Sequence, residues 1–228
     1  MLREKIGKLI KLCSRIAVIT GMALVMLIPT KVYASIKPFE LSESSVNYYD
    51  KKVVVIEPGH MGEGYDTGAI AIDGRYEADM TLELAKDIEK ELKKEGIEVY
   101  LTRTKTEKNT LGEVIRETNS KKPDLSLQIH FNSAENKEAT GAEIFYNTAT
   151  YDQYGNVVVK DFSNTIADSL NIVDRGAKQS PFYNRKMNEP AILIENCFIS
   201  NEEDLAKYDK NKDTLVKKIT QKIINMVK

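Results

Sequence analysis

The chain has 228 residues, of which 42% are hydrophobic and 29% are charged, as expected for one globular domain with or without a targeting segment. Residues 1–34 hold six of the 33 basic side chains and one of the 34 acidic ones, which leaves residues 35–228 with a formal charge of −6. This acidic balance argues against nucleic acid and against an anionic membrane surface as partners.

Residues 1–34 have the pattern of a secretion signal. A basic start is followed by the apolar run Ile16–Pro29 and by Val32-Tyr33-Ala34, which offers small residues to a signal peptidase. The apolar run is shorter than the roughly 20 residues that span a bilayer as a helix. We therefore expect cleavage after Ala34 and export, with an uncleaved membrane anchor as the alternative.

A polar stretch, residues 35–50, follows and is interpreted as a linker, so that residues 51–228 form the folded domain. Cys13 would leave with the signal, and Cys197 would then be the only cysteine. An internal disulfide is therefore excluded in the exported chain. We expect Cys197 to be a small buried thiol rather than a catalytic one.

The domain begins with a strand–helix–strand pattern. Val53–Ile56 is a continuous β-branched run, typical of a strand covered on both faces. A helix is predicted over Ala78–Glu95 from its four-residue apolar spacing, with Gly96 as its terminating residue. Apolar alternation over 97–101 then predicts a second strand parallel to the first.

The same alternation of helices and strands continues to the end of the chain. The predicted elements are a helix over Leu111–Ser120, a strand over 125–130, a strand over Ala142–Tyr146, a helix over Val157–Leu170, a strand over Ala191–Ile194 and a helix around 215–223. This order predicts a single α/β domain with a mostly parallel, twisted sheet flanked by helices. Ligands of such sheets bind at the carboxyl ends of the strands, and we expect the active site there.

Two histidines and one glutamate fall at these predicted strand ends. His60 follows the first strand, His130 ends the third, and Glu195 directly follows Ala191–Ile194. Two imidazoles and a carboxylate are a common zinc set, and a second carboxylate can act as a general base. Glu77, at the start of the first helix, returns to the same edge of the sheet.

The pattern alone leaves these assignments open. Both histidines could be ordinary surface or core residues, and Glu195 could be a hydrogen-bonded structural group. Glu77 has four acidic neighbours that position cannot distinguish from it, namely Glu63, Asp66, Asp73 and Asp79.

Residues 53–204 carry an ordered set of short motifs that resembles the zinc-dependent N-acetylmuramoyl-L-alanine amidases, which cleave peptidoglycan. The matching segments are Val53–Ile56 with Pro58-Gly59-His60, Asp66–Ala69, Glu77-Ala78-Asp79, Leu101-Thr102-Arg103, Arg116 with Asn119, Gln128–Asn132, Gly141-Ala142-Glu143, Asp174-Arg175-Gly176, Pro190–Glu195 and Phe198–Asn201. Each segment is weak evidence alone, whereas their common order and spacing are specific.

This resemblance implies one Zn²⁺ held by His60, Glu77 and His130, with Glu195 as the catalytic carboxylate. It implies hydrolysis of the amide that joins the lactyl group of N-acetylmuramic acid to L-alanine of the stem peptide. We also expect Asn132, within the matched segment Gln128–Asn132, to contact the substrate. The expected location is secreted, at the cell wall or the extracytoplasmic face.

The chain departs from the family pattern at three places. Glu57 replaces the usual Asp before Pro-Gly-His and is a candidate partner for the His60 ring, Cys197 replaces a common Gly, and Met61-Gly62 replaces a Gly pair. The connection over Asn147–Asn156 is too short for the inhibitory plug helix of some relatives. Our hypothesis is therefore control through expression, targeting or an activating protein partner. A monomer is the default expectation for the oligomeric state.

Two other functions remain as alternatives. A zinc peptidase with the same ligands could cleave a bond within the stem peptide, and its products would identify it. A catalytically dead wall-binding module would have no chemical need for His60, Glu77, His130 and Glu195 together.

Overall fold

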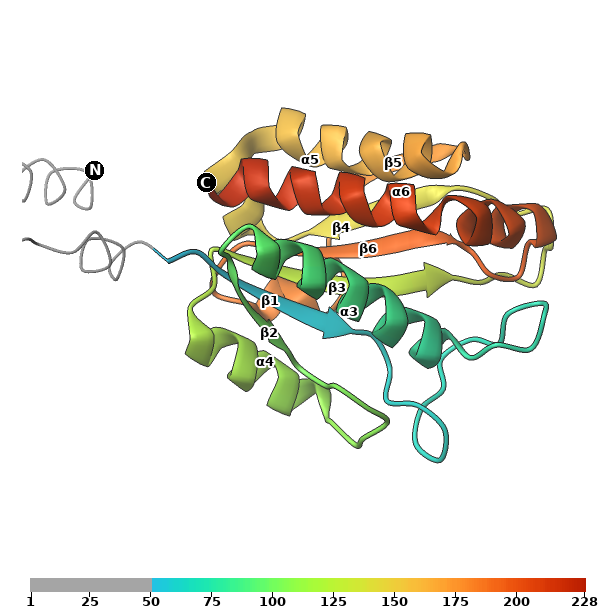
Figure 1. Cartoon of the computed structure of the whole chain (residues 1–228), viewed down its shortest axis with the longest axis horizontal. Coiled ribbons are helices and arrows are strands. Elements are labelled where there is room, and N and C mark those ends of the chain that lie inside the picture. The colour runs from blue at the N-terminus through green and yellow to red at the C-terminus, as the bar shows by residue number, and fades with distance from the viewer. Residues whose placement is uncertain (1–50) are drawn as a thin grey trace, which may run out of the picture. The chain divides into compact units, whose positions relative to one another are not determined.

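The computed structural model describes residues 51–228, shown as a cartoon in Figure 1. The predicted signal peptide 1–34, its cleavage after Ala34 and the linker 35–50 lie outside the described residues. Among the helices of residues 51–228, none combines the length and the apolar character needed to cross a membrane.

The centre of the domain is a six-stranded sheet with the strand order β2-β1-β3-β6-β4-β5. All neighbouring pairs are parallel except β4 with β6, which confirms the predicted mostly parallel α/β sheet. The strands are β1 Val53–Pro58, β2 Glu98–Leu101, β3 Leu125–Asn132, β4 Ala142–Tyr146, β5 Asp174–Gln179 and β6 Ala191–Phe198.

Three long helices cover one face of the sheet. In Figure 1, α6 (Glu202–Val227) lies between α3 (Glu77–Lys94) and α5 (Thr148–Leu170). Alternate strand residues, such as Val54 and Ile56 of β1, point into the apolar core under these helices. This core contributes most of the buried apolar surface of the domain and fixes the strands that carry the candidate site.

The other face of the sheet is more polar and carries a smaller cover. Strand periodicity places Glu57, Gln128 and Glu195 on this side, opposite the large core. It is covered by α4 (Leu111–Lys121) and the 3₁₀ helix η2 (Tyr183–Lys186). Val114 of α4, Met187 after η2 and Ala191 of β6 form a small apolar cluster there. Most of the side chains on this face are nevertheless buried, with Glu57 5% and Gln128 0% exposed.

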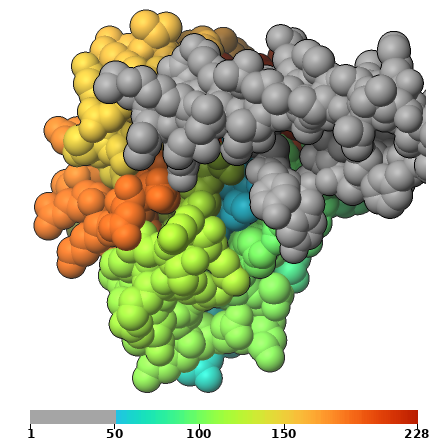
Figure 2. All heavy atoms as spheres, turned by 90° about the vertical axis from the view of Figure 1, so that its left-hand side faces the viewer, coloured from blue at the N-terminus to red at the C-terminus, as the bar shows by residue number. Residues whose placement is uncertain are grey.

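The α4 helix and the segment around η2 are joined at the amino end of the sheet. Figure 2 shows the lime-green end of α4 beside the orange segment that contains η2. Asn119 of α4 accepts a hydrogen bond from the Asn188 backbone N–H at 2.9 Å. This contact fixes the two covering elements to each other, and with them the position of Tyr183.

The structure corrects four element assignments. The β5 strand was not predicted, α6 starts thirteen residues before Leu215, and β6 continues three residues beyond Glu195. The connection predicted over Asn147–Asn156 is wrong, because α5 starts at Thr148 and is kinked at Gly155, where φ is 74°. The physical reason is the Asn147 side chain, which caps the helix by accepting a hydrogen bond from the Thr150 N–H.

Asn147 is only 2% exposed and organises the amino end of the sheet. Its Oδ1 atom accepts hydrogen bonds from the backbone N–H and hydroxyl of Thr150 and from the Ala191 N–H. Its Nδ2 atom donates to the carbonyls of Met187 and Glu189. One side chain thus joins the start of α5, the start of β6 and the chain after η2.

We expect Asn147→Ala to lower the free energy of unfolding by about 2–4 kcal/mol, because buried donors and acceptors would lose their partners. Urea unfolding followed by circular dichroism measures this change. Asn164→Ala, on the exposed side of α5, is the matched control and should change stability by less than about 0.5 kcal/mol. Equal effects of the two substitutions would contradict this role of Asn147.

Candidate active site

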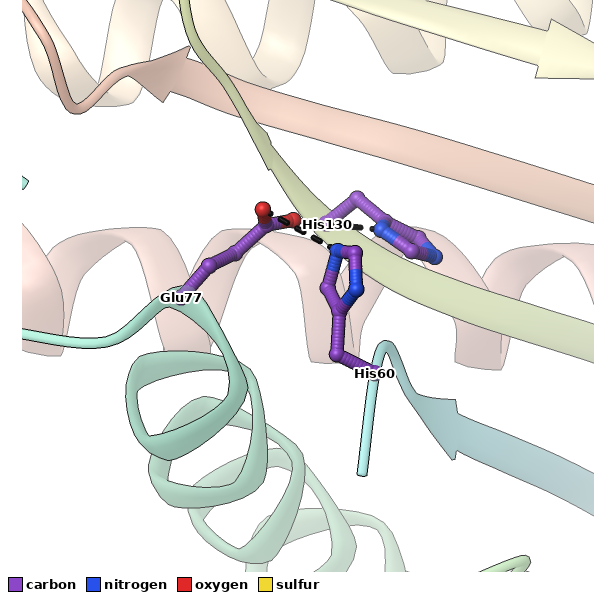
Figure 3. A group of neighbouring side chains, drawn as sticks. All are labelled: His60, Glu77 and His130. Carbon is purple, nitrogen blue, oxygen red and sulfur yellow. Dashed lines mark hydrogen bonds and ion pairs between the residues drawn. The ribbon is translucent and has the colours of Figure 1, made fainter. Parts of the chain in front are cut away.

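Three side chains from separate elements meet at the carboxyl edge of the sheet. His60 is the second residue after β1, Glu77 is the first residue of α3, and His130 lies in β3 (Figure 3). Glu77 Oε2 lies 3.0 Å from His60 Nε2, and Glu77 Oε1 lies 3.2 Å from His130 Nδ1. One nitrogen or oxygen atom of each residue lies within 4.8 Å of the others, a spacing that could hold a metal ion.

The Glu77 carboxylate is 3% exposed and is held from four directions. Besides the two imidazoles, it accepts hydrogen bonds from the backbone N–H groups of Ala69 at 3.1 Å and Phe131 at 3.0 Å. Burial alone would raise the pKa of Glu77, but hydrogen bonds and charges of His130 and His60 hold this pKa well below its ordinary value. Glu77 is therefore an anion positioned between two nitrogen ligands.

The His60 ring is oriented by Asp66. His60 Nδ1 lies 3.0 Å from Asp66 Oδ2, so Asp66, and not the expected Glu57, is the outer partner of this imidazole. Burial acts to lower the pKa of His60, but Glu77 and Asp66 raise it to about 9. The Asp66–Ala69 motif was visible in the sequence, yet sequence alone did not show that its carboxylate turns back to His60.

Close approach of backbone to side chain explains two glycines of the site. A Cβ atom on Gly59 would lie 2.4 Å from the His130 ring. A Cβ atom on Gly68 would lie 2.6 Å from the His60 ring and 2.8 Å from the Glu77 carboxylate, and Gly68 also has a φ of +66°. Larger residues at either position would displace the candidate ligands.

Arg103 connects the two segments that carry His60 and Glu77. This guanidinium is 3% exposed and donates hydrogen bonds to the carbonyls of Pro58, Gly59 and Ala78, at 2.7–3.0 Å. The end of β1 and the first turn of α3 are thereby tied to one planar group. The contact explains why Arg103 is buried although it is always charged.

Glu195 lies beside the cluster, within β6 rather than at its end. It is the strand neighbour of His130 on one side and of Glu143 on the other. Its Oε2 atom is buried and has no hydrogen-bond partner among residues 51–228. Burial, together with the charges of Glu77 and Glu143, raises the pKa of Glu195 to about 8. The structure thus places a protonatable carboxyl group next to the histidine–glutamate cluster.

The remaining candidates have structural partners. Asn132 donates through Nδ2 to Glu143 at 2.7 Å, and Glu143 also forms ion pairs with Lys178 and Arg175 of the edge strand β5. Cys197 is fully buried as a free thiol, as expected from the sequence. Neither Lys178 nor Arg175 was singled out as a functional residue by sequence reasoning.

The donor set suits a divalent metal ion. The imidazoles of His60 and His130 and the carboxylate of Glu77 converge, and Asp66 orients the His60 ring. The buried Nε2 atom of His130 has no hydrogen-bond partner within residues 51–228. Nitrogen and oxygen donors of this kind are accepted by several divalent ions. Sequence had proposed this trio only through the family resemblance, since spacing could not choose Glu77 from its acidic neighbours.

Comparison with known proteins identifies the family to which the chain belongs. LytC of Bacillus subtilis, an N-acetylmuramoyl-L-alanine amidase, is 30% identical over 157 residues, which is 68% of this chain and 31% of LytC. The crystal structure of an N-acetylmuramoyl-L-alanine amidase from Clostridium difficile 630 superimposes with a TM-score of 0.70. It is 30% identical, and the match covers 77% of this chain and 96% of that one.

Cwp6 from Clostridium difficile has a similar domain, with 32% identity, a TM-score of 0.69 and coverage of 78% of this chain and 30% of Cwp6. The chain therefore corresponds to about a third of the length of LytC and of Cwp6. The family model described as N-acetylmuramoyl-L-alanine amidase matches residues 54–228. The chain belongs to the N-acetylmuramoyl-L-alanine amidase family.

Proposed function

We propose that the protein is a secreted zinc hydrolase of peptidoglycan. It cleaves the amide between the lactyl group of N-acetylmuramic acid and L-alanine of the stem peptide, at the cell wall or the extracytoplasmic face. The observation that carries this proposal is the convergence of His60, Glu77 and His130 beside the buried, unpartnered carboxyl of Glu195. Family membership supplies the substrate class.

In this proposal His60, Glu77 and His130 hold one Zn²⁺. A zinc ion bound there supplies Lewis acidity for the scissile carbonyl and a positive charge that favours ionised Glu195. Asp66 keeps the His60 ring in its orientation, and Gly59 and Gly68 leave room for the two imidazoles. The protein contributes two imidazoles and one carboxylate whose ligand atoms already lie within 4.8 Å of one another.

Glu195 acts as the general base and then as the general acid. Its carboxylate removes a proton from the attacking water, and the same carboxyl returns a proton to the departing alanine nitrogen. Asn132 borders the substrate in this proposal, and its amide positions Glu143 beside Glu195.

Two alternatives are retained for testing. A zinc peptidase acting within the stem peptide would use the same cluster, and a wall-binding module would bind peptidoglycan without cleaving it. The proposed catalytic domain is residues 51–228, acting as a monomer after removal of residues 1–34. An activating or targeting protein partner is the form of control that we propose for it.

Mass spectrometry of peptidoglycan fragments digested by purified residues 35–228 tests the bond that is cleaved. We expect free stem peptides that start with L-alanine, lost on chelation and restored by Zn²⁺. Cleavage between stem residues would favour the peptidase instead. Binding to insoluble peptidoglycan without any released fragment, in a sample shown to contain zinc, would favour the wall-binding module.

Glu195→Gln tests the proposed base, because the amide keeps the size of the side chain but cannot accept the proton. We expect kcat to fall by about 10²–10⁴-fold while the zinc content stays at one ion per chain. Glu117→Gln is the matched control, since it makes the same change on the exposed side of α4, and it should retain full activity. Turnover of Glu195→Gln within tenfold of the unmodified protein would remove Glu195 from the mechanism.

The raised pKa of His60 predicts a steep pH dependence of zinc affinity. Since this pKa is about 9 in the metal-free protein, His60 is protonated at pH 7 and must lose that proton to bind the ion. The dissociation constant should therefore fall about tenfold per pH unit from pH 7 to 9 and level off above that range. Competition with a fluorescent zinc indicator measures it. A constant affinity from pH 7 to 9 would show that zinc binding does not release a proton from His60 in this range, and would contradict the raised pKa.

A further inference from the structure

Positive charge is concentrated in the second half of α6. Residues 210–228 hold six lysines and one acidic residue, Asp213, so this segment has a formal charge of +5. Residues 35–209 hold 21 basic and 32 acidic side chains, which gives them a formal charge of −11. The acidic balance of residues 35–228 as a whole is therefore compatible with one strongly basic segment.

The apolar side chains of this segment are committed to the core of the domain. Leu215, Ile219 and Ile223 are fully buried, and α6 lies between α3 and α5 on the helix-covered face of the sheet (Figure 1). Helical periodicity leaves the lysines on the solvent side. Residues 210–228 expose no large hydrophobic side chain. The outer surface of this half of α6 is therefore charged rather than apolar.

Three of the six lysines fasten α6 to neighbouring parts of the domain. Their ion pairs are Lys212 with Glu83 and Asp87, Lys222 with Asp161, and Lys228 with Glu95. The other three are exposed and form no ion pair with any of residues 51–228, namely Lys210, Lys217 and Lys218. Lys210 and Lys217 are seven residues apart, so they lie on the same side of the helix, about 10 Å from each other along its axis.

Lys90 of α3 extends this surface beyond α6. It is exposed, forms no ion pair within residues 51–228 and lines the same surface depression as Lys217. The acidic residues Asp87 and Glu91 of the depression are already engaged in ion pairs, which leaves Asp213 against two uncommitted cations. We call the four uncommitted cations the α6 basic surface, which consists of Lys90, Lys210, Lys217 and Lys218.

On the basis of the proposed location at the cell wall, we propose that the α6 basic surface docks the protein on a phosphodiester polymer of the wall. Lysines bind phosphates as point charges without a fixed geometry, and a row of them along a helix suits an extended polyanion better than a single small anion. The −11 charge of residues 35–209 repels the same polymer, so that the α6 side is the favoured point of contact.

Docking through α6 leaves the candidate active site free. The three helices cover one face of the sheet, whereas strand periodicity places Glu195 on the other. The surface of an anionic bilayer offers the same phosphate chemistry, but helices that lie on bilayers insert an apolar face. The apolar face of α6 is packed in the core, and this favours the polymer.

Binding of residues 35–228 to immobilised poly(glycerol phosphate) tests the proposal. We expect the affinity to fall between about 50 and about 200 mM NaCl, because the contacts are ionic. The triple variant Lys210→Gln, Lys217→Gln, Lys218→Gln should raise the dissociation constant about tenfold or more and make it less sensitive to salt. Substitution of the same three residues by arginine should keep the dissociation constant within about twofold, because the charges are retained.

The matched control removes three charges on the other side of the sheet. Lys105→Gln, Lys108→Gln and Lys186→Gln together change exposed cations that precede α4 or lie in η2 and form no ion pair within residues 51–228. This variant should raise the dissociation constant by less than about twofold, because its charges lie away from the contact. Circular dichroism verifies that all variants are folded.

Three results would overturn the assignment. They are the absence of binding to the polymer by the unmodified protein at the lower salt concentration, an equal loss of affinity in the two glutamine variants, and tighter binding to vesicles of phosphatidylglycerol and phosphatidylcholine than to the polymer. The last result would assign the surface to a bilayer instead.

Turnover of a soluble muropeptide separates this inference from the proposed function. The α6 glutamine variant should cleave it at the rate of the unmodified protein, because the substituted lysines lie on the face of the sheet opposite Glu195. If the unmodified protein binds the polymer but releases no peptide that starts with L-alanine, the proposed reaction is wrong and the docking surface stands. If it cleaves the muropeptide but does not bind the polymer, the docking surface alone is wrong.

Discussion

The Glu77 carboxylate is the group on which the arrangement of the site depends. A carboxylate this deeply buried would be strongly destabilising without partners. Its partners are two imidazoles and the backbone N–H groups of Ala69 and Phe131, so the chain after β1, the start of α3 and the end of β3 must all meet there. Arg103 stabilises the same junction by donating hydrogen bonds to backbone carbonyls at the end of β1 and in the first turn of α3. The need to provide partners for the buried Glu77 carboxylate therefore determines both the local fold and the positions of the two histidines.

Residues that form the core and residues with polar side chains lie on opposite faces of the sheet, because side chains alternate along each strand. Residues such as Ile56 and Leu127 face three helices and form the large core. Their neighbours Glu57, Gln128 and Glu195 face the other side, where α4 and η2 give only a partial cover. Side chains on that side can change with little effect on the core, because alternation keeps the two sets apart. The candidate ligands and Glu195 therefore lie on a sheet whose other side supplies most of the apolar core.

The sequence predicted the elements whose apolar pattern reflects burial. Val53–Ile56 and Ala191–Ile194 are buried on both faces, and their continuous apolar runs identified them. The β5 strand escaped detection because Asp174–Gln179 is an edge strand with mostly exposed residues and no apolar alternation. The first turns of α5 depend on the Asn147 cap and on contacts distant in sequence. The contact between Asp66 and His60 could not be predicted either, because it depends on how the loop after β1 folds.

The three candidate ligands all come from residues 60–130, whereas Glu195 lies on β6 and α5 contributes no ligand to the cluster. An ion bound to the cluster would therefore add its binding energy to the β1–α3–β3 half of the domain. Amide hydrogens in that half should become more protected from exchange with solvent than those of β4, β5 and α5. The strand that carries Glu195 pairs with β3 on one side and with β4 on the other, so it connects the ligand-bearing elements to the rest of the sheet. Metal supply would thus set the local order of the domain as well as its turnover.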